Sequence, residues 1–263
     1  MDLQLTGKLA LVTGSTAGIG YAIAQALAAE GADVIINGRS QASVDEAVAS
    51  LTADATGRLF GFAGDVATAE VADRLHAAYP DVEILINNVG IFEPVAFEDI
   101  TDSDWRRFFE VNVLSGVRLA RHYLPVMKQK DWGRIIFISS ESGIQIPAEM
   151  IHYGMTKSAQ ISVARGLAED VAGTGITVNS VLPGPTRSRG VGDFVEDMAR
   201  QQGQTLTQFE ADFFEHVRPT SLIQRFASTE EVASMVCYLV SPLASATTGA
   251  AVRVDGGVVK SAF

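Results

Sequence analysis

Short apolar runs alternate along the chain with longer segments whose apolar residues recur at the spacing of a helix. The short runs predict strands at Leu9 to Thr13, Val34 to Asn37, Leu59 to Ala63, Ile84 to Asn87, Arg134 to Ser139, Thr177 to Leu182 and Ala251 to Val254. Most of them are nearly all apolar, as is typical of parallel strands that helices cover on both faces. The alternation therefore predicts an α/β fold in which helical crossovers join parallel strands.

The longer segments predict helices at Ile19 to Glu30, Ala42 to Ala53, Ala69 to Tyr79, Ser103 to Lys128, Tyr153 to Val171 and Thr229 to Leu239. Ser40 and Thr101 stand where N-caps are expected, and Gly31 follows the first helix as a stop. Ser228 with Glu231 has the pattern of a capping box. No linker or internal repeat interrupts the alternation, so residues 1–263 are expected to form one domain.

Composition narrows the class of protein. The 263 residues are 47% hydrophobic and 19% charged, which favours a compact fold over disorder. The formal net charge of -11 opposes binding to nucleic acid or anionic lipid. The one cysteine, Cys237, lies in an apolar helical segment and is expected to be a buried thiol. No metal site is predicted.

The first residues lead straight into a strand and lack the basic start and apolar run of a secretory signal. Leu9 to Ala29 carries no charge, but its glycines and hydroxyl side chains are not typical of a membrane span. A cytoplasmic protein that acts on a small molecule, without membrane or nucleic-acid partners, is therefore expected.

A glycine-rich turn lies between the first strand and the first helix. The run Thr13-Gly14-Ser15-Thr16-Ala17-Gly18-Ile19-Gly20 places three glycines where a dinucleotide fingerprint requires them. Glycines let the backbone approach a pyrophosphate, whose charge the helix N-terminus stabilises. The spacing is G-x-x-x-G-x-G, and the motif by itself is equally compatible with a purely structural turn.

The end of the second strand bears on the choice of cofactor. An acid at this point accepts bonds from a ribose 2'-hydroxyl and repels a 2'-phosphate, but here the run is Asn37-Gly38-Arg39-Ser40. Arg39 could grip a phosphate with its planar guanidinium, which favours NADP over NAD. The alternative is a solvated arginine at the start of a loop.

Two more strand ends carry polar residues. Gly64-Asp65-Val66 follows the third strand and Asn87-Asn88-Val89-Gly90 closes the fourth, both at carboxyl ends where open α/β sheets bind ligands. Asp65 is predicted to bond the adenine amino group or, equally, to cap a turn.

Tyr153 and Lys157 are the candidate catalytic pair. Four residues apart on a predicted helix, they share one face, and a cation beside a phenol favours the phenolate. This lowers the pKa of tyrosine from its ordinary value near 10 and suits the residue to proton exchange at neutral pH. The isolated pattern is common on protein surfaces, so its neighbours have to support the assignment.

Those neighbours are Ser139 and Ser140, which end the fifth strand 14 and 13 residues before Tyr153, and Asn112 in the long helix after the fourth strand. With the glycine turn, the Asn88 run and Pro183-Gly184 they stand in the order of a known family. The sequence resembles the single-domain branch of the short-chain dehydrogenase/reductase family over nearly its whole length. The resemblance implies a Rossmann-type, doubly wound parallel sheet of about seven strands in three α/β/α layers.

The resemblance also implies a role for each catalytic position. Tyr153 would exchange a proton with the substrate oxygen, and Ser140 would hydrogen-bond that oxygen. Lys157 would lower the tyrosine pKa and hold the nicotinamide ribose, while Asn112 would fix a water that relays protons. Ser140 is chosen over Ser139 because it lies 13 residues before the tyrosine, as in the family.

The cofactor-binding set implied by the motifs spans the carboxyl edge of the predicted sheet. Val89 replaces the alanine usual in the family, and Ser188 stands where relatives often have threonine, with Thr186 as a rival. The expected contacts are Gly14, Ser15, Thr16, Gly18, Ile19, Gly20, Gly38, Arg39, Asp65, Val66, Asn88, Val89, Gly90, Tyr153, Lys157, Pro183, Gly184, Thr186 and Ser188.

The segment from about 189 to 225 is predicted to be a helical lid over the substrate, with amphipathic stretches at Phe194 to Gln202 and Leu206 to Val217. Its aromatic residues either face the substrate or pin the segment to the core: Phe194, Met198, Phe209, Phe213 and Phe214. Apolar residues are expected to border the cleft and to favour an apolar or medium-sized substrate: Ile91, Phe92, Ile144, Ile146 and Met150.

The predicted function is NAD(P)-dependent interconversion of a carbonyl, such as a ketone or beta-ketoacyl group, and a secondary alcohol. A dinucleotide-binding sensor or scaffold without turnover is the alternative, although a sensor has no use for a tuned phenol. The family resemblance further implies a homotetramer or homodimer formed by the long helices.

Overall fold

Seven parallel strands form the central sheet of the computed structural model, which describes residues 1–188, 199–200 and 203–262. The strand order is β3-β2-β1-β4-β5-β6-β9. The strands are β1 (Leu9–Val12), β2 (Asp33–Gly38), β3 (Leu59–Ala63), β4 (Ile84–Asn87), β5 (Gly133–Ile138), β6 (Ile176–Pro183) and β9 (Ala251–Val254). The chain runs outward from β1 to β3 and then returns to place β4 beside β1. This reversal opens a crevice at the carboxyl ends of β1 and β4.

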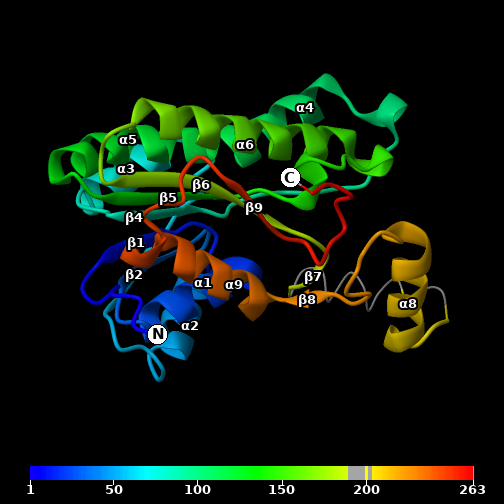
Figure 1. The fold of residues 1–263 in the computed structure, drawn as a ribbon, viewed down its shortest axis with the longest axis horizontal. Coiled ribbons are helices and arrows are strands. Elements are labelled where there is room, and N and C mark those ends of the chain that lie inside the picture. The colour runs from blue at the N-terminus through cyan, green and yellow to red at the C-terminus, as the bar shows by residue number, and fades with distance from the viewer. Residues whose placement is uncertain (189–198, 201–202, 263) are drawn as a thin grey trace.

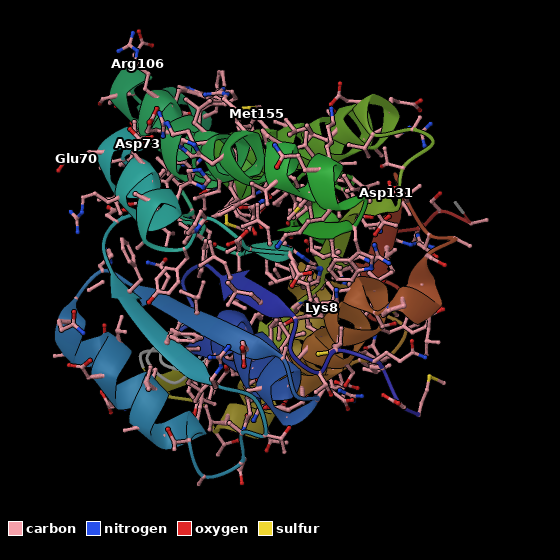
Figure 2. The ribbon with its side chains drawn as sticks, turned by 90° about the vertical axis from the view of Figure 1, so that its left-hand side faces the viewer. Lys8, Glu70, Asp73, Arg106, Asp131 and Met155 are labelled. Carbon is pink, nitrogen blue, oxygen red and sulfur yellow. The ribbon has the colours of Figure 1, made fainter. Side chains whose placement is uncertain are left out.

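Helices cover both faces of the sheet (Figure 1). One layer contains α1 (Gly18–Ala29), α2 (Gln41–Leu51) and α9 (Thr229–Val240). The other contains α3 (Ala69–Ala78), α4 (Asp102–Phe109), α5 (Ser115–Lys130) and α6 (Ile151–Asp170). In the end-on view of Figure 2, Asp73 of α3 and Met155 of α6 lie in this second layer, above the sheet. The predicted three-layer, Rossmann-type architecture is confirmed.

Alternate residues of each strand feed two separate cores, one on each face of the sheet. On β1, for example, Ala10 and Val12 pack toward α1 and α9, whereas Leu11 packs toward α3 and α5. This two-sided burial explains why the strands are apolar at nearly every position. Cys237 lies in the first core, as expected, and burial raises the pKa of its thiol to about 12.

The local signals at helix ends are also confirmed. The side chains of Ser40, Thr101 and Ser228 each accept a hydrogen bond from the backbone at the start of a helix. Gly31 has a φ of 86°, in the left-handed region that glycine tolerates. These ends depend on short-range bonds, which is why sequence patterns locate them well.

The predicted helix from Ser103 to Lys128 differs from the structure. It is divided into α4 and α5 by one π-helical turn, η2 (Glu110–Leu114). The extra residue in that turn cannot be seen in the apolar spacing, because both flanking helices keep their buried faces. Such insertions often mark functional sites, and Asn112 lies inside this one.

A smaller unit follows β6 at the carboxyl end of the sheet. The two-residue strands β7 (Thr186–Arg187) and β8 (Ala227–Ser228) pair with each other, and α8 (Leu206–Asp212) continues into the π turn η5 (Phe213–Val217). Figure 1 shows α8 standing apart from the two helical layers, beyond the strand ends. The strand pair was not predicted, because two residues carry no periodicity. Of the predicted stretch Phe194 to Gln202, only residues 199–200 are described.

The cap at the start of α9 provides a test of these local contributions. Ser228 and Glu231 form a reciprocal capping box. We expect Ser228→Ala to lower the free energy of unfolding by about 1 kcal/mol. Ser234→Ala is the matched control, because Ser234 is exposed and bonds only within the helix, to Glu230 O. A denaturant titration that shows equal losses for both variants would contradict the capping assignment.

Candidate active site

A cavity of about 490 Å³ opens at the carboxyl edge of the sheet. Its walls come from the start of α1, from the segments after β4, β5 and β6, from α6, and from the α8–η5 unit. It brings together Ile19, Asn88, Gly90, Ser140, Tyr153, Lys157, Pro183, Gly184, Thr186 and Ser188, all predicted as site residues.

The glycine turn offers backbone donors at one side of this cavity. Gly14 and Gly18 have φ values of 62° and 60°, in the left-handed region. In the described part of the chain no N-cap side chain bonds the first N–H groups of α1, where Ala17 stands at the cap position. A Cβ on Gly20 would overlap Asn88 Nδ2 and lie 2.5 Å from Gly14 O, so only glycine fits the approach. This is the geometry that a phosphate at a helix N-terminus requires.

Three polar side chains behind the turn hold it to the sheet. Asn37 Oδ1 accepts from Gly14 N–H at 3.2 Å, and its Nδ2 donates to the carbonyls of Phe62 and Gly64, each at 3.1 Å. Thr13 Oγ1 accepts from Asn88 N–H at 2.9 Å, and Asn88 Nδ2 donates back to Thr13 O at 2.9 Å. The supporting roles of Thr13 and Asn37 were not predicted. Their places at strand ends beside the motif were the only signal.

Two of the predicted cofactor contacts, Ser15 and Asp65, make local hydrogen bonds. Ser15 is fully buried, its hydroxyl donates to Val12 O at 2.7 Å, and its N–H donates to Asn37 O. Both of its donors are therefore used inside the turn. Asp65 is exposed and accepts from Ala67 N–H at 3.0 Å, which agrees with the alternative of a turn cap. Val66 points into the core beside α3 and α5.

Arg39 extends from the end of β2 and is exposed. Within the described part of the chain it makes no ion pair or hydrogen bond, whereas Arg58, at the opposite edge of the sheet, is bonded to Asp33. Gly38 is tightly enclosed, because a Cβ there would overlap the methyl group of Thr16. The edge thus presents the guanidinium of Arg39 beside the glycine turn, with no partner among the residues that the structure describes.

Tyr153 and Ser140 meet in the cavity. Burial raises the pKa of Tyr153 to about 12, and a hydrogen bond with Ser140 acts in the opposite direction. The charge of Glu141 raises this pKa further, and that of Arg218 lowers it. Ser139, on the other face of the strand, donates instead to Lys157 O at 2.8 Å, as expected for a local bond.

Lys157 is almost wholly buried one helical turn after Tyr153, and its Nζ donates to Ile138 O at 2.9 Å. Its Nζ lies 5.5 Å from the centre of the Tyr153 ring. Burial lowers the pKa of Lys157 to about 7. In this structure Ser140 and Arg218 lower the pKa of Tyr153, and a lowering of that pKa by Lys157 stays a prediction.

Asn112 is positioned by the π turn between α4 and α5. Its side chain exchanges hydrogen bonds with the backbone of Ile91 at 2.8 and 3.0 Å and donates to Thr156 Oγ1 at 2.9 Å. Its own carbonyl accepts from Gln160 Nε2 at 2.6 Å. The π turn thus joins the loop after β4 to α6, next to Lys157.

A buried carboxylate beside the catalytic serine was not predicted. Glu141 follows Ser140 directly and is 4% exposed. Its Oε2 accepts from the hydroxyls of Ser140 and Ser142, both at 2.6 Å, and its Oε1 accepts from Arg218 Nε at 3.2 Å. Arg218 also reaches Glu149 at 3.5 Å. An acid immediately after the serine was the available signal, but its partner lies 77 residues away.

The remaining walls are largely apolar. Phe92 packs edge-on against Tyr153 at 6.3 Å between ring centres, and Met150 also lines the cavity, as predicted. Ile144 and Ile146 are 43% and 49% exposed and are not among the lining residues. Ser188 lies against the glycine turn, 3.3 Å from where a Cβ on Gly18 would stand.

The aromatic residues of the α8–η5 unit both pack in a core and face the cavity, the two roles predicted for them. Phe209 and Phe214 are buried with Phe226 in a small core of their own, which supports the packing alternative. Phe209, Phe213 and Phe226 nevertheless face the cavity as well. Phe194 and Met198 lie outside the described residues.

Two searches over residues 1–188, 199–200 and 203–262 gave negative results. No group of histidine, cysteine and acidic side chains there has the arrangement of a metal site. No helix in that part of the chain is long and apolar enough to cross a membrane.

Known proteins share this sequence and fold. A family profile described as enoyl-(acyl carrier protein) reductase matches residues 14–259. An uncharacterized oxidoreductase of Bacillus subtilis, YvaG, is 51% identical over 100% of both chains. D-beta-hydroxybutyrate dehydrogenase of Cupriavidus necator is 36% identical, over 97% of this chain and 99% of its own. L-sorbose reductase from Gluconobacter frateurii, complexed with NADPH and L-sorbose, superposes with a TM-score of 0.93 at 31% identity, over 99% of this chain and 100% of its own.

The chain belongs to the short-chain dehydrogenase/reductase family. The class of enzyme predicted from the motifs, an NAD(P)-dependent oxidoreductase that interconverts carbonyl and secondary alcohol groups, is thereby confirmed.

Burial of Lys157 predicts a pH-dependent cost in stability. Its pKa is about 7 when folded against 10.5 in the free side chain, so the unfolded chain binds more protons between these values. The free energy of unfolding therefore rises with pH across this window, and the penalty is fully present below it. We expect Lys157→Met to be more stable than the parent by about 2 kcal/mol at pH 7. Denaturant titrations should show this advantage shrinking toward pH 10.5, and an advantage independent of pH would contradict the burial effect.

Proposed function

We propose that this protein is an NADPH-preferring enzyme that reduces a carbonyl to a secondary alcohol, and catalyses the reverse oxidation, with Tyr153 as its acid/base. The observation that carries the proposal is the convergence of Tyr153, Ser140 and Lys157 on one cavity at the carboxyl edge of the sheet. Asn112 lies directly behind them.

The chain's own residues fit a nicotinamide dinucleotide. The start of α1 and the enclosed Gly20 suit a pyrophosphate. Arg39, which has no partner in the described part of the chain, suits a ribose 2'-phosphate. Pro183, Gly184, Thr186 and Ser188 would border the nicotinamide end. The bound nicotinamide supplies or accepts the hydride, and everything else falls to the protein.

The protein's part is to hold and move one proton. Tyr153 donates its phenolic proton to the substrate oxygen in reduction and takes it back in oxidation, while Ser140 fixes that oxygen by a hydrogen bond. Lys157 holds the nicotinamide ribose and, with Asn112 and a fixed water, returns the proton to the phenolate. A lysine with a pKa of about 7 can give or take a proton near neutrality, which suits it to this relay.

The substrate is proposed to be a ketone of modest size. The cavity of about 490 Å³ has apolar walls at Phe92, Met150 and Phe213, and polar groups at Ser140 and Glu141. Relatives with such a frame act on a sugar, as the name L-sorbose reductase states, or on a hydroxy acid, as D-beta-hydroxybutyrate dehydrogenase does. Three further proposals concern the whole protein: a single domain with the segment around 189–225 as a lid, a homotetramer or homodimer, and a cytoplasmic location.

Replacing Tyr153 by phenylalanine tests the chemistry. Tyr153→Phe removes the exchangeable proton and keeps the ring, so turnover should fall by about 100-fold to 10,000-fold while cofactor binding persists. Tyr238→Phe is the matched control, because Tyr238 is 41% exposed on α9, far from the cavity. Near-normal turnover of Tyr153→Phe with any substrate of the parent would refute its role.

The choice of cofactor depends on Arg39. Arg39→Ala should raise the dissociation constant of NADPH roughly 10-fold to 100-fold and leave that of NADH almost unchanged, because only NADPH carries the 2'-phosphate. Arg106→Ala removes the same charge from an exposed site on α4 and serves as the control for net charge. Equal losses for both cofactors, measured by calorimetry, would show that Arg39 is structural.

A further inference from the structure

The hydroxyl of Ser140 has more acceptors than protons. It carries one O–H, and two acceptors compete for it: the carboxylate of Glu141 at 2.6 Å and the phenol oxygen of Tyr153. A carboxylate is the stronger acceptor, so the proton of Ser140 points toward Glu141. The phenol oxygen of Tyr153 then meets a lone pair of Ser140 and keeps its own proton until a carbonyl oxygen binds, when the Ser140 hydroxyl turns from Glu141 to donate to that oxygen.

The surroundings of Glu141 keep its carboxylate in this position. Ser142 donates a second hydroxyl to the same oxygen, and Arg218 Nε holds the other oxygen. Glu141 and Arg218 are 6% and 13% exposed in their side chains, so neither is screened well by solvent. A buried pair of this kind costs desolvation energy, which a core of apolar side chains would avoid. Its place beside the catalytic serine suggests that the cost serves the chemistry.

The two charged side chains nearest the phenol act on its pKa in opposite directions. Glu141 raises the pKa of Tyr153 and Arg218 lowers it. Lys157 approaches the ring from the same helix, and Glu149 touches Arg218 from the far side at 3.5 Å. Near Ser140, two carboxylates thus face one guanidinium, and the carboxylate nearer to the phenol is Glu141.

We propose that Glu141 is a positioning residue that accepts the hydrogen bond of the Ser140 hydroxyl, with Arg218 as its counter-charge. This keeps the phenol of Tyr153 protonated, so that Tyr153 is the proton donor. The inference rests on the proposed function and adds a preferred direction of reaction. The site favours carbonyl reduction, in which Tyr153 must carry its proton. In that step the phenol O–H bond breaks, the proton passes to the substrate oxygen as the hydride reaches the carbonyl carbon, and a phenolate remains. Replacing Glu141 by an uncharged residue frees the Ser140 proton for the phenolate and removes a repelling charge. Both changes ease the loss of the proton.

The test compares the pH dependence of carbonyl reduction in three single variants. The parent should lose kcat at alkaline pH as Tyr153 ionises. In Glu141→Gln this loss should move to lower pH by about one unit, the size of effect that a nearby charge has on a pKa. In Arg218→Gln it should move to higher pH, because Glu141 loses its counter-charge. A side chain with only a structural role would lower kcat without moving the profile in opposite directions for the two partners.

Glu149→Gln is the matched control. It removes the same charge from the same network without touching Ser140, so its shift should be clearly smaller than that of Glu141→Gln. In a Ser140→Ala background the shift caused by Glu141→Gln should shrink, because the shared hydroxyl is gone. An unmoved or alkaline-shifted profile for Glu141→Gln overturns the proposal, as does an equal shift for Glu149→Gln.

A measurement that needs no turnover separates this proposal from the proposed function. The ultraviolet absorbance of tyrosinate, titrated with pH and corrected by subtracting the Tyr153→Phe curve, reports Tyr153 alone. Its midpoint should fall in Glu141→Gln and rise in Arg218→Gln. If no carbonyl compound is reduced but these midpoints move as stated, the proposed function fails and the role of Glu141 stands. If reduction occurs and both variants titrate at the same midpoint as the parent, the proposed role of Glu141 is wrong. Should Glu141→Gln not fold, Arg218→Gln decides by the direction of its shift.

Discussion

The hydrogen bonds of Thr13, Asn37 and Asn88 hold together the carboxyl ends of β1, β2 and β4. At this edge the chain leaves the strands for the crossover helices, and backbone bonds such as Ser15 N–H to Asn37 O still join neighbouring segments. The three side chains add to these bonds and join the glycine turn to both neighbouring strands. Because their donors and acceptors are satisfied by the protein, the N–H groups at the start of α1 stay directed outward. The crevice between β1 and β4 is thus held open by polar bonds from within.

The neighbouring half of the site is governed by burial. Burial shifts the pKa values of both Tyr153 and Lys157, to about 12 for the phenol and about 7 for the amine. The two displacements favour the neutral form of each side chain, which is the form that can pass a proton without creating a second charge. The pKa of the phenol is also lowered by Ser140 and Arg218 and raised by Glu141. Burying these groups lowers the free energy of unfolding and, in return, defines their protonation states.

Much of this arrangement was predictable because its signals are local. The seven strands follow from apolar runs, the helix starts from Ser40, Thr101 and Ser228, and the site from motifs with a set order. What could not be predicted depends on contacts between distant segments. The π turn at Asn112 is invisible in a helical pattern, and the partner of Glu141 arrives from the far end of η5. Asp65 fits a cofactor contact and a turn cap equally well in the sequence, and in the structure it accepts a bond from Ala67 N–H.

The account's central claim is that this site turns over a carbonyl substrate and does not merely bind a dinucleotide. The most direct measurement is a panel of ketones, sugars, beta-ketoacyl thioesters and secondary alcohols, assayed with the parent protein and NADPH, NADH or their oxidised forms. We predict that at least one carbonyl compound is reduced, faster with NADPH than with NADH. Tight binding of NADPH without oxidation of the cofactor by any member of the panel would contradict the account and favour a dinucleotide sensor.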